Sequence, residues 1–288
     1  MKKALKILAL VVSIGLVIAL LVFTDSFLGN PISRHLATKT AEKHLAEVYA
    51  GTDYEIKDLG YDFKDGAYYA HIISPSSPDT YFSLSIRKNG RLHWDSYDDS
   101  VTSGWNTSSR LTEEYRVLVD RVLQLPTFPF QAEIAASDLA YGMLEFMPRE
   151  AYEDPSLAEI PDYCMPMDTL ELDGVYDVSE LGSQCGELVI YAASDTVTVE
   201  KAAQMLLAIR QGMDEAGIGF RTISFTLHPP RVEGEPRPDT RVQTDHFPYE
   251  EIYEEGMIDR LTAAIDALNE SYDQMNAEKQ AMIETAEP

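Results

Sequence analysis

Residues 61–97 read YDFKDGAYYAHIISPSSPDTYFSLSIRKNGRLHWDSY, and they carry the clearest pattern in this chain of 288 residues. Runs in which apolar and polar residues alternate are separated by two turn signals, Asp65-Gly66 and Lys88-Asn89-Gly90. Alternation with a period of two places every second side chain on the same face of a strand. With the residues from Tyr54 onward, this stretch predicts a four-stranded antiparallel meander that has one apolar face.

Each turn fixes the register of the two strands that it joins. A two-residue loop at Asp65-Gly66 brings apolar residues opposite one another. At the second turn, a two-residue loop would pair Ile86 with His93 and mix the faces, so we expect a three-residue loop with Gly90 left-handed. The expected apolar pairs are Phe63 with Tyr68, Tyr61 with Ala70, Leu59 with Ile72, Ile86 with Leu92 and Leu84 with Trp94.

A helix is expected before the meander, at residues 34–49. Gly29-Asn30-Pro31 would break the preceding chain, and Ser33 would cap the helix. Its apolar face would consist of Ala37, Ala41, Leu45 and Val48. This face can cover the apolar side of the meander, which gives a small α+β domain.

Residues 7–23, ILALVVSIGLVIALLVF, contain no charge and would span roughly 26 Å as a helix, close to the hydrocarbon thickness of a bilayer. Three lysines precede this segment, at positions 2, 3 and 6, and the next basic residue is Arg34. The positive-inside rule then predicts a cytoplasmic N-terminus and a main body outside a bacterial cell membrane. A retained single-pass anchor is favoured over a cleaved signal peptide, because Thr24 and Ser26 make a poor cleavage site.

The net charge is −25, and residues 1–24 carry three lysines and no acid, so the remainder carries −28. Such a surface repels phosphate backbones, which excludes nucleic acid as an expected partner. A soluble, well-solvated body outside the membrane is the simplest interpretation of this charge. The sharper alternative is a surface that buffers cations or binds calcium.

The second half of the chain predicts another α+β domain. Residues 149–168 are acidic and contain several prolines, which favours a connection between domains or a long surface loop. The expected segments are a helix at 110–125 capped by Ser108 or Ser109, a strand at 187–193, a helix at 198–216, a strand at 220–227, a loop at 229–238, an edge strand at 241–247 and a helix at 249–284. Strand, helix and strand form a β-α-β unit in a two-layer sandwich, with Thr222, Ser224 and Thr226 facing water.

The C-terminal helix carries apolar residues at alternating spacings of three and four, which is a heptad seam. The seam consists of Ile258, Leu261, Ile265, Leu268, Tyr272, Met275, Lys279 and Met282. The helix is expected to dock on its own domain, and a coiled-coil contact with a partner is the alternative. The expected division of the chain is a stub and anchor at 1–28, a first domain at 29–148, the connection at 149–168 and a second domain at 169–288.

Three runs of sequence carry a resemblance to a known family. They are GNPISRHLATKTAEKHLAEVY at 29–49, the meander at 61–97, and NTSSRLTEEYRVLVDRVL at 106–123. Over about residues 28–125 the chain resembles the YfjL-like family of membrane-anchored bacterial proteins, and its helix and meander look like PepSY and cystatin-like domains. The resemblance implies an anchored, exported architecture. It transfers no catalytic residue to this chain.

The outer face of the first sheet is the first place where the sequence could hold chemistry. The expected registers place Ser85 opposite His93 and Ser83 opposite Asp95, with His71 and Tyr69 one strand away. A serine hydrolase needs such groups, but it also needs a pocket and an oxyanion hole, which an open sheet face does not form. A polar, water-facing surface is therefore the favoured interpretation.

Other polar groups are sparser. Asp95, Asp98 and Asp99 lack the spacing of a calcium-binding loop, and His44 with Glu47 lacks a third ligand for a metal. Cys164 and Cys185 could pair outside the membrane or stay free.

We therefore assign no catalytic, cofactor-binding or metal-ligating residue from the sequence, since no recognised motif for such a site occurs. The expected role is binding or interaction, as an accessory or regulatory envelope protein whose partners are the bilayer and another envelope protein. The alternative is an envelope enzyme with its site in the C-terminal domain or at the domain junction.

Overall fold

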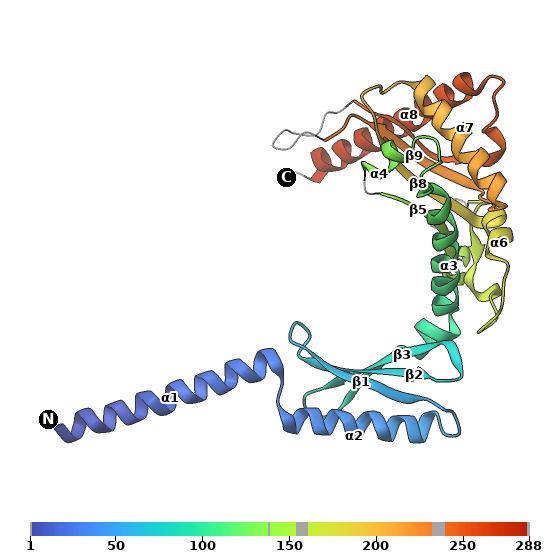
Figure 1. Ribbon diagram of the computed structural model, residues 1–288. Helices are drawn as coiled ribbons and strands as arrows, with labels where there is room; N and C mark the ends of the chain where they lie inside the picture. The colour runs from blue at the N-terminus through green and yellow to red at the C-terminus, as the bar shows by residue number, and fades with distance from the viewer. Residues whose placement is uncertain (1, 138, 154–160, 232–239, 287–288) are drawn as a thin grey trace. The chain divides into compact units, whose positions relative to one another are not determined.

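The computed structural model describes residues 2–137, 139–153, 161–231 and 240–286. The chain divides into two compact units, residues 1–107 with 171–174, and residues 108–170 with 175–288 (Figure 1). Each unit has its own hydrophobic core, which confirms the expected α+β class. The division falls at Thr107, whereas the sequence pattern had placed the connection at 149–168.

The first unit begins with two consecutive helices, α1 (Lys2–Leu28) and α2 (Pro31–Val48). Gly29 separates them with a φ of 69°, and a β-carbon at this position would collide with the Tyr68 hydroxyl. Tyr68 accepts a hydrogen bond from the Asn30 backbone N–H and donates one to the Asn30 carbonyl, both at 3.0 Å. The Asn30 side chain, and not Ser33, caps α2 by accepting from the Ser33 N–H at 2.8 Å.

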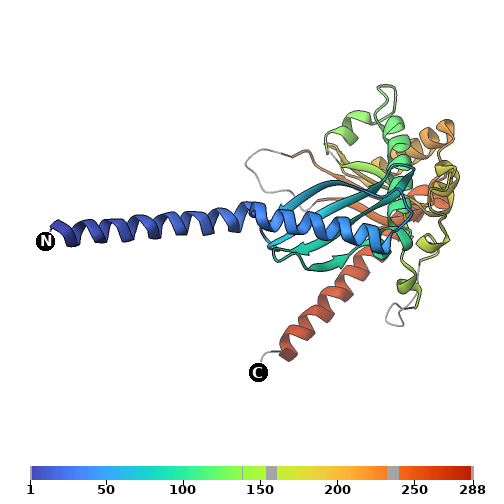
Figure 2. The ribbon, with the colours of Figure 1, turned by 90° about the horizontal axis from the view of Figure 1, so that it is seen from below.

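The first sheet is an antiparallel meander in the order β1-β2-β3-β4, as expected. Its strands are β1 (Glu55–Asp62), β2 (Ala67–Ser74), β3 (Ser77–Arg87) and β4 (Leu92–Asp95). The helix α2 lies along one face of this sheet (Figure 2). Ala37 and Ala41 are fully buried there, Leu45 is partly buried, and Val48 is exposed, contrary to its expected place on the apolar face.

The first turn differs from the expected two-residue loop. Residues 63–66 form a four-residue connection, so Tyr61 pairs with Tyr68. The observed register differs from the expected one by two residues. Because side chains alternate between faces with a period of two, the apolar side chains stay on the expected face. Phe63 leaves the sheet because its ring stacks on Phe27 of α1, with the ring centroids 5.4 Å apart.

The second turn confirms the pairing of Ile86 with Leu92, and Gly90 is left-handed with a φ of 80°. A β-bulge then places Trp94 opposite Ser85. The expected pairing of Leu84 with Trp94 is therefore wrong, and Trp94 is 46% exposed. The extra residue transfers the following side chains to the opposite face, so that Asp95 points toward α2.

The second unit contains the remaining helices and strands, apart from the start of α3. The elements are α3 (Trp105–Leu123, which begins in the first unit), α4 (Gln131–Ala135), β5 (Ala140–Leu144), β6 (Phe146–Met147), α5 (Arg149–Glu153), β7 (Met165–Pro166), α6 (Val178–Cys185), β8 (Gly186–Ala193), α7 (Val199–Ala216), β9 (Thr222–His228), β10 (Val242–Pro248) and α8 (Met257–Ala286). Helix α3 starts before Ser108 and Ser109, so neither residue is its cap.

The second sheet has the order β10-β9-β8-β5. Strands β8 and β9 are parallel and joined by α7, which confirms the β-α-β unit. Thr198, the first residue of the expected helix, lies before α7 and caps it by accepting from the Lys201 N–H, and left-handed Gly217 ends the helix. Thr222 and Thr226 are buried, so the expectation that this face of β9 meets water is wrong for both.

Residues 161–170 belong to the second unit and do not form a free connection. The Met165 N–H donates to the Glu145 carbonyl at 2.9 Å, and β7 pairs in parallel with β6. Arg221 holds the same segment through an ion pair with Asp162 at 2.9 Å. The rest of the expected connection, residues 154–160, and most of the expected loop at 229–238 lie outside the described residues.

Helix α8 begins at Met257, later than expected, and docks on its own unit through its first half. Met257 and Leu261 are buried and Ile265 packs against the core, whereas Met275 and Met282 are exposed. Within the expected seam, Leu261 and Ile265 therefore belong to the core, whereas Ile258 at its start is exposed.

The bulge at β4 gives a testable difference between two large apolar residues of the first sheet. Leu84→Ala should lower the free energy of unfolding by about 2–5 kcal/mol, because Leu84 is fully buried. Trp94→Ala should lower it by about 1 kcal/mol or less, because that ring is half exposed. Urea denaturation of the full chain in detergent, followed by circular dichroism, measures both. Equal losses would place Trp94 in the core and contradict this register.

Candidate functional site

An irregularity in the edge strand β10 brings polar groups together. The pairing with β9 shifts between Thr244 and Phe247, which leaves Asp245 and His246 outside the regular ladder. His246 has a positive φ of 45°, an uncommon conformation for a residue with a side chain. Its backbone N–H donates to the Ser224 hydroxyl of β9 at 3.1 Å, and this bond fixes the bulge on the neighbouring strand.

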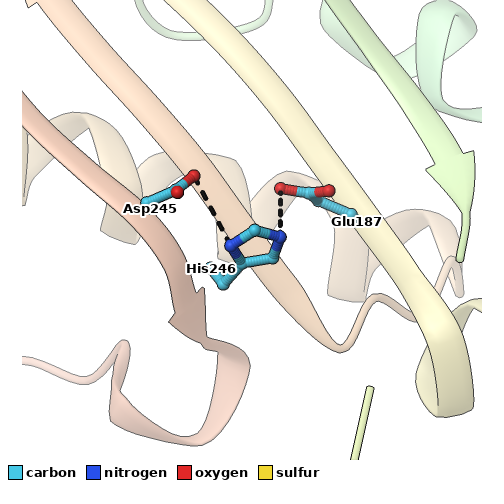
Figure 3. A group of neighbouring side chains, drawn as sticks. All are labelled: Glu187, Asp245 and His246. Carbon is cyan, nitrogen blue, oxygen red and sulfur yellow. Dashed lines mark ion pairs between the residues drawn. The ribbon is translucent and has the colours of Figure 1, made fainter. Parts of the chain in front are cut away.

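The imidazole of His246 lies between two carboxylates, one from the neighbouring residue and one from β8 (Figure 3). Its Nε2 is 3.6 Å from Glu187 Oε1, and its Nδ1 is 3.5 Å from Asp245 Oδ1. Glu187 is only 5% exposed, although it is a charged residue at the start of a strand. One ligand atom from each of the three residues lies within 4.8 Å of the others, so together they could hold a metal ion.

The Ser224 hydroxyl joins the two carboxylates. Its Oγ lies 2.5 Å from Glu187 Oε1 and 2.6 Å from Asp245 Oδ1. A hydroxyl has one proton, so Ser224 can donate to only one of these oxygens at a time. The other close contact needs a proton on a carboxyl group or a positive charge nearby.

Glu145, which directly follows β5, extends this group. Burial, followed by a hydrogen bond with the Glu187 carboxylate, raises the pKa of Glu145 to about 7. Two carboxyl groups at hydrogen-bonding distance share a proton more readily than they both ionise. The site therefore tends to retain a proton near neutral pH when no cation replaces it.

The segment that follows the undescribed residues 154–160 covers the site. The Tyr163 ring stacks on the His246 imidazole, with centroids 4.5 Å apart and planes 15° from parallel. Burial raises the pKa of Tyr163 to about 12, so its hydroxyl is neutral. The stacked ring shields one face of the imidazole from water.

The two cysteines are free thiols in the structure, which leaves the expected alternative of a disulfide unformed here. Burial raises the pKa of Cys164 to about 11 and that of Cys185 to about 12. A protonated thiol is a poor nucleophile and a poor metal ligand. Neither cysteine therefore contributes a reactive group to the site at neutral pH.

The outer face of the first sheet holds the residues that were weighed as a hydrolase site. His71 Nδ1 lies 3.0 Å from the Ser83 hydroxyl, and Asp58 lies 3.8 Å from His71 Nε2. The acid beside this histidine is therefore Asp58 and not Asp95. These side chains lie on open sheet surface, where β2 and β3 pair with each other, so the favoured interpretation as a polar surface stands.

The remaining pairings expected on that face do not form. Ser85 is buried opposite Trp94, and His93 contacts Arg87 at 3.4 Å. Tyr69 donates to Asp65 at 2.7 Å.

Asp95 takes a structural role on the other face. Its Oδ2 lies 2.7 Å from His44 Nε2 and accepts from the Tyr49 hydroxyl at 2.8 Å. His44 thus pairs with Asp95 and not with Glu47, which contacts Lys43. Asp98 accepts a hydrogen bond from Thr102 within a π-helical turn at Asp98–Thr102, close to Asp99.

No sequence motif predicts a role for Glu187, Asp245 or His246. One signal was present, because Glu187 is the only charged residue in the otherwise apolar stretch GELVIYAA at 186–193. A buried carboxylate at such a position requires partners. Those partners come from a distant strand, and the bulge that aims them has no simple signature in the sequence.

These features define a class of protein with two small α+β units, the first preceded by an apolar helix and the second bearing a buried carboxylate–histidine group. The chain belongs to the YfjL-like family. Residues 1–96 match the YfjL-like N-terminal domain, and residues 114–262 match the YfjL-like C-terminal domain. The resemblance seen at residues 28–125 therefore extends over both units.

Other comparisons add little. No curated protein matches the chain. A crystal structure of a DUF5037 family protein from Ruminococcus gnavus is similar at 17% identity, over 67% of this chain and 74% of that chain. Its TM-score of 0.20 is too low to show a shared fold.

The raised pKa of Glu145 predicts a pH-dependent stability. The folded state holds this proton more tightly than the unfolded chain, so the stabilisation is present below about pH 4.5 and is lost as the pH rises through about 7. Glu145→Gln should therefore raise the free energy of unfolding at pH 8 by about 1–2 kcal/mol, allowing for partial solvent screening. The difference should shrink toward pH 5.

Urea denaturation at pH 5 and pH 8 checks this prediction. Glu278→Gln, at an exposed position of α8, is the matched control and should change the stability by less than about 0.5 kcal/mol at either pH. A Glu145→Gln protein that is destabilised at pH 8 would contradict the proposed sharing of a proton.

Proposed function

We propose that this chain is a membrane-anchored protein of the bacterial envelope that holds two binding modules on the outer side of the cell membrane. The observation that carries the proposal is α1, which is near the N-terminus and is long and apolar enough to cross a bilayer by length and composition. Its apolar side chains from Leu10 to Phe23 are exposed. An uncovered apolar surface of this size is unfavourable in water.

The orientation follows from the distribution of charge. Basic residues flank only the N-terminal side of the apolar segment, which favours a cytoplasmic N-terminus. On the other side, Lys88 donates to the Asp25 carbonyl at 2.8 Å and pairs with the Asp25 carboxylate at 2.9 Å. These contacts, together with Tyr68 and Asn30, would hold the first unit close to the membrane surface.

Binding is favoured over catalysis by the state of the polar groups in the second unit. The Ser224 hydroxyl is engaged by two carboxylates and by the His246 backbone, so the imidazole is not placed to activate it as a nucleophile. An envelope enzyme with its site in this unit is the second candidate. The proton-holding Glu145 beside Glu187 favours it, because a general acid requires such a raised pKa.

The second half of α8 is the surface that we propose for contact with another envelope protein. Tyr272 is half-buried, and beyond it the seam residues Met275 and Met282 are exposed. An exposed heptad seam is the kind of surface that a coiled-coil partner covers. This surface supports an accessory role beside a larger envelope assembly.

The proposed topology predicts the result of protease treatment of intact cells. The protease should remove the two units outside the membrane, and an epitope placed at the N-terminus should stay protected. Replacing Lys2, Lys3 and Lys6 together with glutamine should weaken this orientation, because it removes the positive charges that hold the N-terminus inside. Protection of the large part of the chain, or recovery of a soluble form that begins near Asp25, would contradict the proposal.

The proposed partner contact predicts a position-specific effect on α8. Met275→Glu should reduce the apparent size of the detergent-extracted complex on a native gel, because a charge would enter the seam. Asn276→Glu, beside the seam, is the matched control and should leave the size unchanged. Thermal unfolding should show that neither change alters the free energy of unfolding by more than about 1 kcal/mol, since both residues are exposed. An equal effect of the two variants, or none, would argue against a partner at this surface.

A further inference from the structure

We propose that Glu187, Asp245 and His246 form a binding site for one divalent first-row transition metal ion, with Zn²⁺ as its best representative. The inference deepens the proposed binding role of the second unit, on which it rests, by naming the class of ligand. It does not depend on the membrane topology, which the protease experiment tests separately.

The donor atoms suit such an ion. Zinc accepts imidazole nitrogen and carboxylate oxygen at about 2.0–2.2 Å, which places neighbouring ligand atoms of a tetrahedral site roughly 3.4 Å apart. His246 Nε2 and Glu187 Oε1 are 3.6 Å apart, and one ligand atom from each of the three residues lies within 4.8 Å of the others. Asp245 Oδ1 lies 3.5 Å from His246 Nδ1, so this exposed side chain must rotate toward Nε2 to complete the set of three ligands. Three protein ligands leave a fourth position open for water.

A buried hydroxyl in the same place supplies independent support. Thr222 pairs directly with Glu187 across β8 and β9, so both side chains lie on the same face of the sheet. Thr222 is 4% exposed, and its Oγ1 has no hydrogen-bond partner among the described residues. A buried hydroxyl without a partner is costly. A water bound to the metal at its open position would provide the missing partner.

The contacts of Ser224 point to the same conclusion. Its single hydroxyl proton cannot satisfy both the Glu187 and Asp245 oxygens that approach it at 2.5 and 2.6 Å. A divalent cation bound to these carboxylates would remove the repulsion between them. Ser224 would then hold the two carboxylates in position, as hydrogen-bonding neighbours of metal ligands commonly do.

The ligand set distinguishes between classes of cation. Calcium takes six to eight oxygen ligands, and magnesium takes oxygen in near-octahedral geometry. A site with one imidazole and two carboxylates is better matched to zinc and its first-row neighbours. Tyr163, stacked on the imidazole, shields one face of this ligand from water.

The experiment uses the full chain in detergent, purified without a polyhistidine tag, at physiological ionic strength and with millimolar calcium present. The calcium saturates weak, non-specific cation-binding positions on the acidic surface of this strongly negative protein. Isothermal titration with zinc chloride should give one site per chain. Micromolar zinc should raise the midpoint of thermal unfolding by several degrees relative to a chelator, as expected for a ligand bound only by the folded state.

Two variants and one control locate the site. His246→Gln and Glu187→Gln should each weaken zinc binding at least tenfold, and His71→Gln, on the outer face of the first sheet, should leave it unchanged. Circular dichroism without zinc verifies that each variant is folded, and the partly exposed His246 provides a test should Glu187→Gln fail to fold. Absence of a stoichiometric site, or equal weakening by His71→Gln, would overturn the proposal.

Discussion

Side chains alternate between the two faces of a β-strand, so a single extra residue transfers the following side chains to the opposite face. Both sheets of this protein use that constraint to place polar groups. In the first sheet, a bulge brings Asp95 under α2, where it binds His44. In the second sheet, an irregularity in β10 turns Asp245 and His246 toward the neighbouring strands. The same kind of irregularity in strand pairing therefore completes a structural contact in one unit and a candidate site in the other.

The buried position of Glu187 explains why the irregularity in β10 brings these particular residues together. A carboxylate in a buried strand is unfavourable unless hydrogen bonds or opposite charge compensate for the lost water. Glu145, Ser224 and His246 surround it on three different segments. Loss of Ser224 or His246 would leave the Glu187 carboxylate with fewer compensating partners, whereas loss of the Glu145 carboxyl group would remove one of the two acids that share a proton. The effects of substitutions within this group are therefore coupled.

The periodic features could be predicted from the sequence because they depend on local pattern. The meander, the β-α-β unit and left-handed Gly90 follow from hydrophobic period and turn chemistry. The exact registers did not follow, because Phe63 packs on a helix distant in sequence and a bulge redirects Trp94. The candidate site escaped prediction for the same reason, since tertiary packing decides which of its residues meet.

The site also joins segments that are distant in the sequence. Arg221, beside β9, pairs with Asp162 of the covering segment at 2.9 Å and with Glu250, just before α8, at 3.0 Å. The covering segment places Tyr163 over His246. Because the ligand atoms come from β8 and β10, they are far apart in the unfolded chain. A ligand that binds them together stabilises only the folded unit, so binding at this site and the docking of these segments are linked by the same free energy.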